Sequence, residues 1–347
     1  MSLLDQLKRE YRTLSIVGMA KNSGKTTTLN YLLEEAFDEG LVLGVTSTGR
    51  DGESTDLVTG TDKPKVYLFT DTIVSVPEKL YGMAETGLEI LRRTAYRTAM
   101  GNVLICRVAD SGYVQVAGPG SIRAHKKLCE DMLDFGVDMI LIDGAIDRKS
   151  IAAPETSDAI ILATGAVISR SLKVVVEETV HIVSLYRSER LTDERALSVL
   201  ADSEEEDFCV AVINDAYDMN VLSVRTGLGA GALLNDAIDE HTKYVYLSGA
   251  LTESIIAGID PGKFRGFTMI LPDPTRIFVG AVKWQQLRKK GFRLRVLRNI
   301  KIAAVTVNPF APSGYAFDHR ELREAIAGSL PDVPVFDVRM GGFGSDD

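Results

Sequence analysis

The sequence predicts an α/β protein in which a mainly parallel sheet is flanked by helices, with a second α/β portion in the C-terminal half. Two observations carry this prediction. Strand-like and helix-like patterns alternate along most of the 347 residues. Near the start, an apolar run over residues 14–17 leads through a glycine-containing loop into a helical pattern over residues 25–39. This order of strand, loop and helix is typical of parallel α/β units.

The other expected elements follow from the same patterns of apolar residues. Gly40 is well placed to end the first helix. We expect strands over residues 41–47, 66–69, 103–108, 113–116, 137–144 and 158–163, and helices over about 78–97, 121–135 and 172–186. Later strands are expected over residues 208–213, 243–247, 267–271, 294–297, 302–307 and 333–338, with a helix near 319–327.

A break in these patterns suggests how the chain divides. Residues 192–207 are acidic and loop-like, which is typical of a boundary. We therefore expect a first domain over residues 1–200, which holds the glycine-containing loop, and a second α/β portion over residues 201–347. Whether this second portion packs back on the first sheet is left open.

Composition narrows the function classes. The chain is 45% hydrophobic and 25% charged, as globular proteins are, and its net charge of −9 argues against general nucleic-acid binding. Residues 283–301 are locally basic, and we interpret them as a solvated helix face and an edge strand whose Lys and Arg side chains prevent aggregation. A chain without an 18-residue apolar run or a signal-peptide pattern is expected to be cytoplasmic and not in a membrane.

The loop after the first strand carries the pattern of a phosphate-binding site. Residues 15–29 read S-I-V-G-M-A-K-N-S-G-K-T-T-T-L. Backbone N–H groups of such a loop surround phosphates, and the following helix directs the positive end of its dipole at them. In this interpretation Gly24 lets the backbone approach, Lys25 neutralises the β- and γ-phosphates, and the Thr26 hydroxyl binds Mg²⁺.

The spacing of this loop differs in one respect from the usual G-x-x-x-x-G-K-[ST]. That pattern requires glycine at position 19, whereas this chain has Met19 and carries Gly18 one residue earlier. A chance Gly-Lys-Thr at a helix start is the alternative, but the flanking strand and helix favour a nucleotide site. The residues expected to bind the nucleotide are Lys21, Asn22, Ser23, Gly24, Lys25, Thr26, Thr27 and Asn308.

Carboxylates at strand ends are candidates for metal binding and catalysis. Asp143 ends the buried-looking run V-D-M-I-L-I-D-G, and a plain turn aspartate is the alternative interpretation. Asp51, with Glu53 and Asp56 nearby, lies in the polar loop after the second strand, and a solvated acidic loop is the alternative there. We assign catalytic roles to Lys25, Asp51 and Asp143, and metal binding to Thr26, Asp51 and Asp143.

The type of nucleotide follows from weaker signals. Asn308 comes at the end of an expected strand, where it could line a base pocket or form an ordinary turn. The chain has no N-K-x-D guanine signature, which favours ATP over GTP. The expected cofactors are therefore ATP, with GTP as the alternative, and Mg²⁺.

The loop A-K-N-S-G-K-T-T-T, together with Asp143, resembles the P-loop NTPases that include dethiobiotin synthetase, the ParA/MinD-like ATPases and the metallochaperone GTPases. The resemblance covers about the first half of the chain. The family loop reads G-K-G-G-x-G-K-T-T, and here Lys21 stands one place after the signature lysine, where Ala20 takes its position. The resemblance therefore does not assign the signature lysine's role to Lys21.

Longer stretches are similar to the small subunit of the ATP-dependent reactivase of lysine 5,6-aminomutase. They are V-G-M-A-K-N-S-G-K-T-T-T-L-N-Y-L, T-S-T-G-R-D-G-E, D-S-G-Y-V-Q-V-A-G-P-G-S and V-T-V-N-P-F-A-P-S-G-Y. This resemblance implies an ATPase that reactivates a protein partner, a cobalamin-dependent enzyme. The loop also resembles that of the Mur ligases, so an ATP-dependent ligase acting on a small molecule and a non-hydrolysing nucleotide sensor stay open. Homo-oligomerisation is open too.

Overall fold

The chain forms two compact units in a computed structural model that describes residues 3–47, 65–144, 156–201, 210–223 and 229–340. Unit 1 comprises Met1–Val180 and Lys301–Asp347, and unit 2 comprises His181–Ile300. The division therefore differs from the break expected at residue 200. The C-terminal segment belongs with the first unit because its strands pair within the sheet of that unit.

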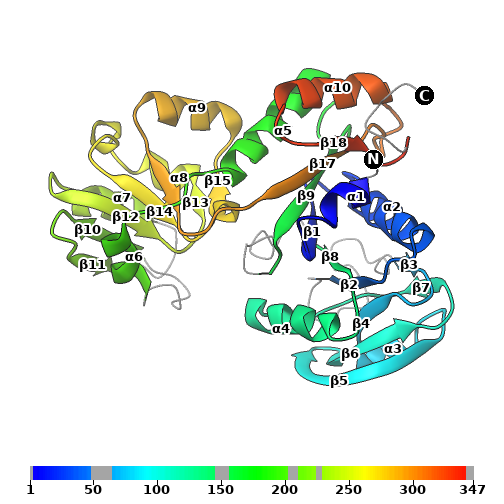
Figure 1. The fold of residues 1–347 in the computed structure, drawn as a ribbon. Helices are drawn as coiled ribbons and strands as arrows, with labels where there is room; N and C mark the ends of the chain where they lie inside the picture. Colours follow the sequence, from blue (N-terminus) through cyan, green and yellow to red (C-terminus); the bar gives the residue numbers. More distant parts are fainter. Residues whose placement is uncertain (1–2, 48–64, 145–155, 202–209, 224–228, 341–347) are drawn as a thin grey trace. The chain divides into compact units, whose positions relative to one another are not determined.

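Unit 1 is an α/β unit built on one large, mostly parallel sheet with helices packed against it (Figure 1). The strand order is β18-β17-β9-β1-β8-β2-β4-β6-β5, and every neighbouring pair is parallel except the two that β6 forms with β4 and β5. Its strands are β1 (Thr13–Gly18), β2 (Leu43–Ser47), β4 (Ile73–Pro77), β5 (Leu88–Thr98), β6 (Gly101–Val108), β8 (Met139–Asp143), β9 (Ala159–Gly165), β17 (Ile302–Asn308) and β18 (Val335–Asp337). The expected fold class is confirmed at this level.

The helices of unit 1 lie on both faces of this sheet. They are α1 (Leu3–Leu7), α2 (Lys25–Asp38), α3 (Glu78–Tyr81), α4 (Ile122–Leu133), the first part of α5 (Leu172–Tyr186) and α10 (His319–Ser329). A small antiparallel pair, β3 (Val66–Leu68) and β7 (Gly112–Val114), completes the unit.

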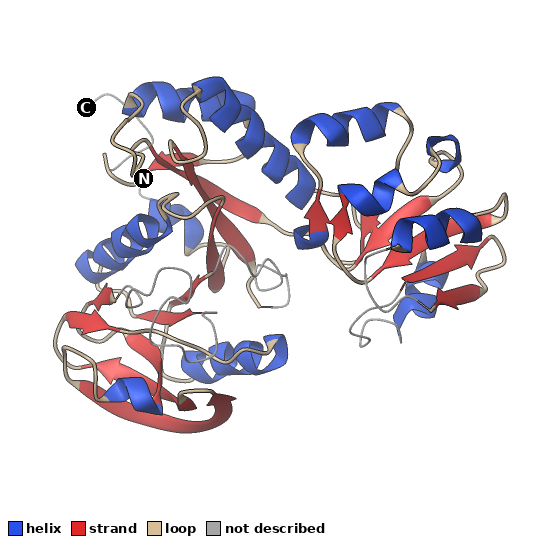
Figure 2. Cartoon of the chain, turned by 180° about the vertical axis from the view of Figure 1, so that it is seen from behind, coloured by secondary structure: helices blue, strands red, loops and turns tan. Residues whose placement is uncertain are grey.

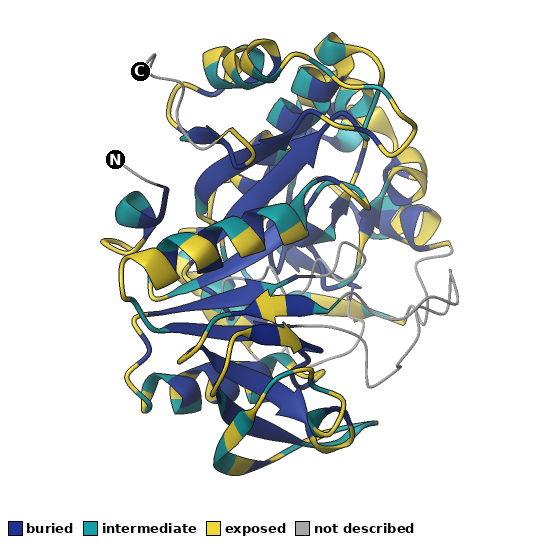
Figure 3. Cartoon of the chain, turned by 90° about the vertical axis from the view of Figure 1, so that its right-hand side faces the viewer, coloured by how far each residue is buried: buried dark blue, intermediate teal, exposed yellow. Residues whose placement is uncertain are grey.

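The alternation of side chains along β8 shows how the two faces are filled. Met139 and Leu141 pack in the core cluster that contains the α1 and α2 leucines, whereas Ile140 and Ile142 pack with α4. Successive strand residues point to opposite faces, so a strand covered on both sides reads as a continuous apolar run. The central strands are accordingly buried, whereas α2 exposes one side (Figure 3).

The prediction of a helix over residues 78–97 is wrong. Only Glu78–Tyr81 is helical, and Leu88–Thr98 forms β5, an antiparallel strand that pairs with β6 at the edge of the sheet (Figures 1 and 2). Gly101 permits the turn of this hairpin because it adopts a φ of 97°. The stabilisation that this segment gains by pairing with β6 outweighs the helix-like spacing of its apolar residues. The sequence interpretation also missed β4, a short β-branched run that ends at Pro77.

Unit 2 contains a second, mixed sheet in the order β11-β10-β12-β14-β16. Its strands are β10 (Val210–Asn214), β11 (Met219–Leu222), β12 (Thr242–Leu247), β14 (Thr268–Leu271) and β16 (Leu294–Val296), with the separate pair β13 (Leu251–Thr252) and β15 (Ile277–Phe278). One face packs against α7 (Ala230–Ala237), α8 (Glu253–Ala257) and α9 (Ala281–Lys289), and the other against α6 (Glu194–Leu200). No described helix in either unit is long and apolar enough to cross a membrane.

Asp193 ties α6 to the sheet of unit 2. It caps α6 by accepting hydrogen bonds from backbone N–H groups, and its other oxygen accepts from the hydroxyls of Tyr217 (2.8 Å) and Tyr244 (2.7 Å). Lys243 lies 3.0 Å from the same oxygen. Burial by itself raises the pKa of Asp193, but hydrogen bonds from the two tyrosines and Lys243 outweigh it and hold that pKa well below its ordinary value.

We expect Asp193→Asn to lower the stability of unit 2 by about 1 kcal/mol near neutral pH, because asparagine keeps the cap but loses the charge. Because the pKa of Asp193 is lower in the folded protein than in the unfolded chain, its negative charge stabilises the fold at pH values above the unfolded pKa of about 4. This contribution is lost progressively as pH falls below that value. The difference between the variant and the parent should therefore shrink from pH 7 to pH 3 in urea unfolding. Asp236→Asn, on the exposed side of α7, is the control, and an unchanged difference at pH 3 would contradict the assignment.

Candidate functional site

The glycine-containing loop begins at the carboxyl end of β1, between two parallel neighbours. In the register of the sheet, Ile16 pairs with Asp143 of β8, and Gly18 pairs with Ala163 of β9. The Met19 N–H donates to the Ala163 carbonyl at 2.9 Å, so the loop leaves the sheet on the β9 side. Ligands of open parallel sheets bind at such strand ends.

Gly18 is required where it stands, which accounts for the unusual spacing of the motif. A Cβ at this position would collide with the Ser23 hydroxyl and would lie 2.9 Å from Cγ of Lys25. The loop therefore folds back over the end of β1 and needs the missing side chain at position 18, not 19. Two further residues turn the loop through left-handed backbone, Asn22 with φ 65° and Gly24 with φ 106°.

The loop ends at the N-terminus of α2, where Gly24 is the cap residue and supplies no side-chain hydrogen bond. The first N–H groups of a helix have no partner within the helix, and here they face the loop without a side-chain cap. The Ser23 hydroxyl is buried and has no hydrogen-bond partner among the described residues. Unsatisfied donors at a helix start form a site suited to an anion.

Lys25 extends from the first position of α2 toward the end of β8. Its ammonium group donates to the Gly144 carbonyl and lies 3.8 Å from the Asp143 carboxylate. The Asp143 side chain is 33% exposed, so it remains accessible at the end of an otherwise buried strand. The structure thus brings together a lysine and a carboxylate that are more than one hundred residues apart in the chain.

A cavity of about 370 Å³ lies over this loop. Its lining includes most of the residues predicted to bind nucleotide, namely Asn22, Ser23, Gly24, Lys25, Thr26, Thr27 and Asn308. Lys21 is exposed and is not among the described residues that line the cavity. Asp143 contacts Lys25 but does not line the cavity either, and Asp51 lies outside the described residues.

Asn308 connects β17 to the loop. Its side-chain amide donates to the Asn22 carbonyl at 3.2 Å, which holds the left-handed turn of the loop. A second contact connects α2 to β17, because the hydroxyls of Thr28 and Thr306 lie 2.8 Å apart. The strand β17 therefore fixes both the loop and the start of α2.

Four residues that line the cavity were missed by the sequence interpretation, namely Phe310, Ala311, Pro312 and Arg339. The Phe310 side chain is 40% exposed, and the guanidinium of Arg339 lies 4.8 Å from its ring centroid. Both line the cavity beside Asn308. Phe310 follows the sequence Asn308-Pro309 at a strand end, which was a usable signal, whereas nothing in the sequence near Arg339 indicates that it joins this site.

His125 is a buried histidine near the end of β2. Burial lowers its pKa to about 4, although a hydrogen bond to the Ser47 backbone raises it in part. Its Nδ1 atom lies 3.8 Å from the Cys129 sulfur. The ring is therefore neutral at physiological pH and packs as part of the core beneath α4.

We expect Gly18→Ala to destabilise unit 1 by about 1–3 kcal/mol, because the added methyl group displaces the loop from the end of β1. Gly82→Ala is the matched control, since a Cβ there meets nothing within 4 Å and its φ is negative. Thermal and denaturant unfolding of both variants measure the effect. Equal stability of the two would show that the loop does not pack over position 18.

Comparison with known proteins identifies no family for this chain. The chain matches no protein-family model, and it matches no curated protein sequence. The nucleotide site is therefore inferred from the chemistry of the residues that form it.

Proposed function

We propose that unit 1 is a P-loop NTPase that binds and hydrolyses a nucleoside triphosphate with Mg²⁺ at residues Asn22–Thr27. The observation that carries the proposal is the placement of Lys25 at the start of α2, 3.8 Å from the strand-borne Asp143. A cation, an uncapped helix N-terminus and an accessible carboxylate meet at the end of one sheet, which is the set of groups that phosphoryl transfer requires.

The loop supplies the contacts for the phosphates. Backbone N–H groups from Gly24 to Thr27 and the Ser23 hydroxyl donate to phosphate oxygens, and the α2 dipole favours their negative charge. Lys25 contacts the Gly144 carbonyl and Asp143, and in the complex it turns to the terminal phosphates. Positioned cations and N–H groups stabilise the charge that develops in the transition state.

The residues present fit a magnesium ion. Mg²⁺ prefers hard oxygen ligands and retains several waters, so it needs only one or two protein groups besides the phosphates. The exposed Thr26 hydroxyl and the partly exposed Asp143 carboxylate would hold it. When bound, it would neutralise the β- and γ-phosphate oxygens. The Asp51 role in metal binding and catalysis stays a prediction of the sequence.

The apolar part of the cavity suits a purine base. Phe310 is 40% exposed and presents a ring on which a base can stack, and Asn308 lines the cavity beside it. Stacking on an aromatic ring is tolerant of base identity, so the absence of an N-K-x-D motif is what favours ATP over GTP.

We further propose that hydrolysis is coupled to remodelling or reactivation of a protein partner. The support is the sequence resemblance to aminomutase reactivases. An ATP-dependent ligase is the alternative, and it requires a pocket for a second substrate that faces the γ-phosphate.

Lys25→Ala should weaken ATP binding by about 100-fold, because the phosphates lose a charge-assisted hydrogen bond. Calorimetric titration of ATP and GTP into the parent and the variant measures this loss. Lys126→Ala, which removes an exposed lysine of α4, is the control. Unchanged nucleotide affinity in Lys25→Ala would contradict the proposed site.

Asp143→Asn should affect turnover much more than nucleotide binding in the absence of metal, because the carboxylate acts through Mg²⁺. Steady-state hydrolysis over a range of Mg²⁺ concentrations, compared with binding in EDTA, separates the two effects. An equal loss of both would show that Asp143 is a structural aspartate.

Turnover by the isolated protein should be slow and should rise when a cobalamin-dependent aminomutase is added. Release of phosphate from ATP, measured with and without the aminomutase and with Lys25→Ala as the inactive control, tests this coupling. Rapid hydrolysis that depends on an added amine or carboxylate acceptor would instead support the ligase alternative.

A further inference from the structure

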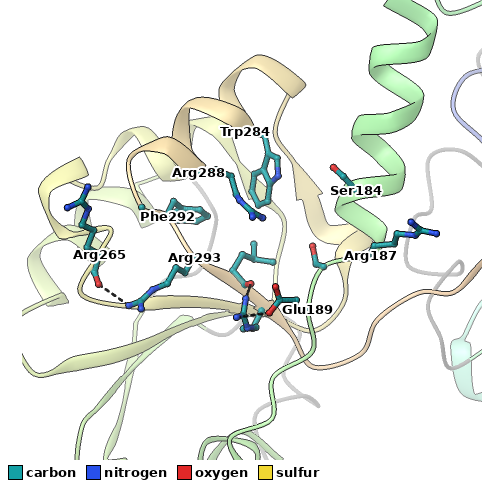
Figure 4. Close-up of a pocket in the computed structure, with 12 residues that line it drawn as sticks. Ser184, Arg187, Glu189, Arg265, Trp284, Arg288, Phe292 and Arg293 are labelled. Atoms are coloured by element: carbon teal, nitrogen blue, oxygen red, sulfur yellow. Dashed lines mark hydrogen bonds and ion pairs between the residues drawn. The ribbon is translucent and has the colours of Figure 1, made fainter. Parts of the chain in front are cut away.

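Unit 2 contains a cavity that the proposed function does not use. Its volume is about 610 Å³, and its twelve lining residues all lie between Ser184 and Arg295 (Figure 4). They come from the C-terminal end of α5, the last turns of α9, the segment that leads into β16, and Arg265. The volume is in the range of sites that enclose small molecules.

The cavity is strongly basic. Its arginines are Arg187, Arg265, Arg288, Arg293 and Arg295, and its one carboxylate is Glu189, so these side chains sum to 5 − 1 = +4. The whole chain has a net charge of −9, which makes this concentration of positive charge a local property of unit 2. The positive charges in such a cluster repel one another unless an anion binds between them.

Four of these arginines have no carboxylate partner in the described part of the chain. Arg295 pairs with Glu189 at 2.7 Å, and Arg293 donates to the Arg265 carbonyl at 2.9 Å. The side chains of Arg187, Arg265 and Arg288 have no hydrogen-bond or ion-pair partner within the described part of the chain. In Figure 4 the Arg288 side chain descends beside Trp284, toward the middle of the group of lining residues, whereas the Arg187 and Arg265 side chains point outward.

The floor of the cavity is apolar and rigid. Trp284, Phe292 and Leu294 are at most 8% exposed. The rings of Trp284 and Phe292 meet edge to face, with centroids 6.2 Å apart and planes 77° apart. A ligand here would rest an apolar part on fixed aromatic rings while its charged part meets the arginine side chains.

Two structural explanations account for only part of this cluster. A cation in the last turn of α9 complements the helix dipole, which explains Arg288 but neither Arg265 nor Arg293. The sequence suggested that the basic residues protect an edge strand. That edge is already covered at Val296, which exchanges backbone hydrogen bonds with Glu189 (3.0 Å) and Leu191 (2.8 Å).

We propose that this cavity binds a phosphorylated small molecule, with its phosphate held by Arg288 and its apolar part against Trp284. Guanidinium groups bind phosphate oxygens in pairs of parallel hydrogen bonds. A nucleic acid fits less well, because the acidic protein as a whole repels a polyanion and the basic area is confined to one cavity. Its lining residues do not include any that line the cavity of unit 1.

The chain has one tryptophan, Trp284, so its intrinsic fluorescence reports on this cavity. We would titrate the full chain with inorganic phosphate, phenyl phosphate and phenol. Phenyl phosphate should change the Trp284 emission saturably and bind more tightly than inorganic phosphate, whereas uncharged phenol should give no saturable change. An equal response to phenol, or no response to either phosphate, would overturn the proposal.

Arg288→Ala should weaken the binding of phenyl phosphate at least about 10-fold, because one charge-assisted contact is lost. Lys289→Ala removes the next cation along α9, which does not line the cavity, and should leave the affinity unchanged. Equal weakening by the two variants, or displacement of phenyl phosphate by a DNA duplex at equal phosphate concentration, would contradict a small-molecule site. Lys25→Ala should keep the Trp284 response, so a failure of the nucleotide site would not be confused with a failure of this one.

Discussion

The position of β1 between β8 and β9 is the constraint on which the candidate site depends. Three parallel strands end side by side there, and their register sets Asp143 opposite Ile16 and Ala163 opposite Gly18. Because the loop starts at the end of β1, Lys25 reaches the end of β8. A shift of one residue in the pairing of β8 with β1 would turn the Asp143 side chain to the other face of the sheet and separate it from the loop.

The strand β17 holds the loop in a backbone conformation that is unfavourable at Asn22. Left-handed backbone at Asn22 is uncommon for a residue other than glycine. The Asn308 amide stabilises it, and the contact of Thr28 with Thr306 fixes the helix that follows. The site therefore includes the C-terminal segment, which pairs in the sheet of unit 1 only after the chain has passed through unit 2.

Charge is distributed differently in the two units. In unit 1 Lys25, Arg339 and the start of α2 supply the positive potential, and the Asp143 carboxylate lies close to Lys25. This balance suits a site that takes a metal together with its nucleotide. In unit 2 several arginines gather around buried aromatic rings, with one carboxylate among them. Guanidinium groups keep their charge at any physiological pH, so this potential does not depend on protonation.

The sequence by itself determined the local features. The apolar runs over residues 14–17 and 137–144 and the Gly24-Lys25-Thr26 start of α2 indicated strand, loop and helix, because these signals depend on neighbours along the chain. Tertiary structure decided what distant contacts control. Leu88–Thr98 became a strand because β6 offered a partner, and Arg339 joined Phe310 because β18 pairs beside β17. The reason for glycine at position 18 likewise lies in the Ser23 hydroxyl that packs against it, which no spacing rule contains.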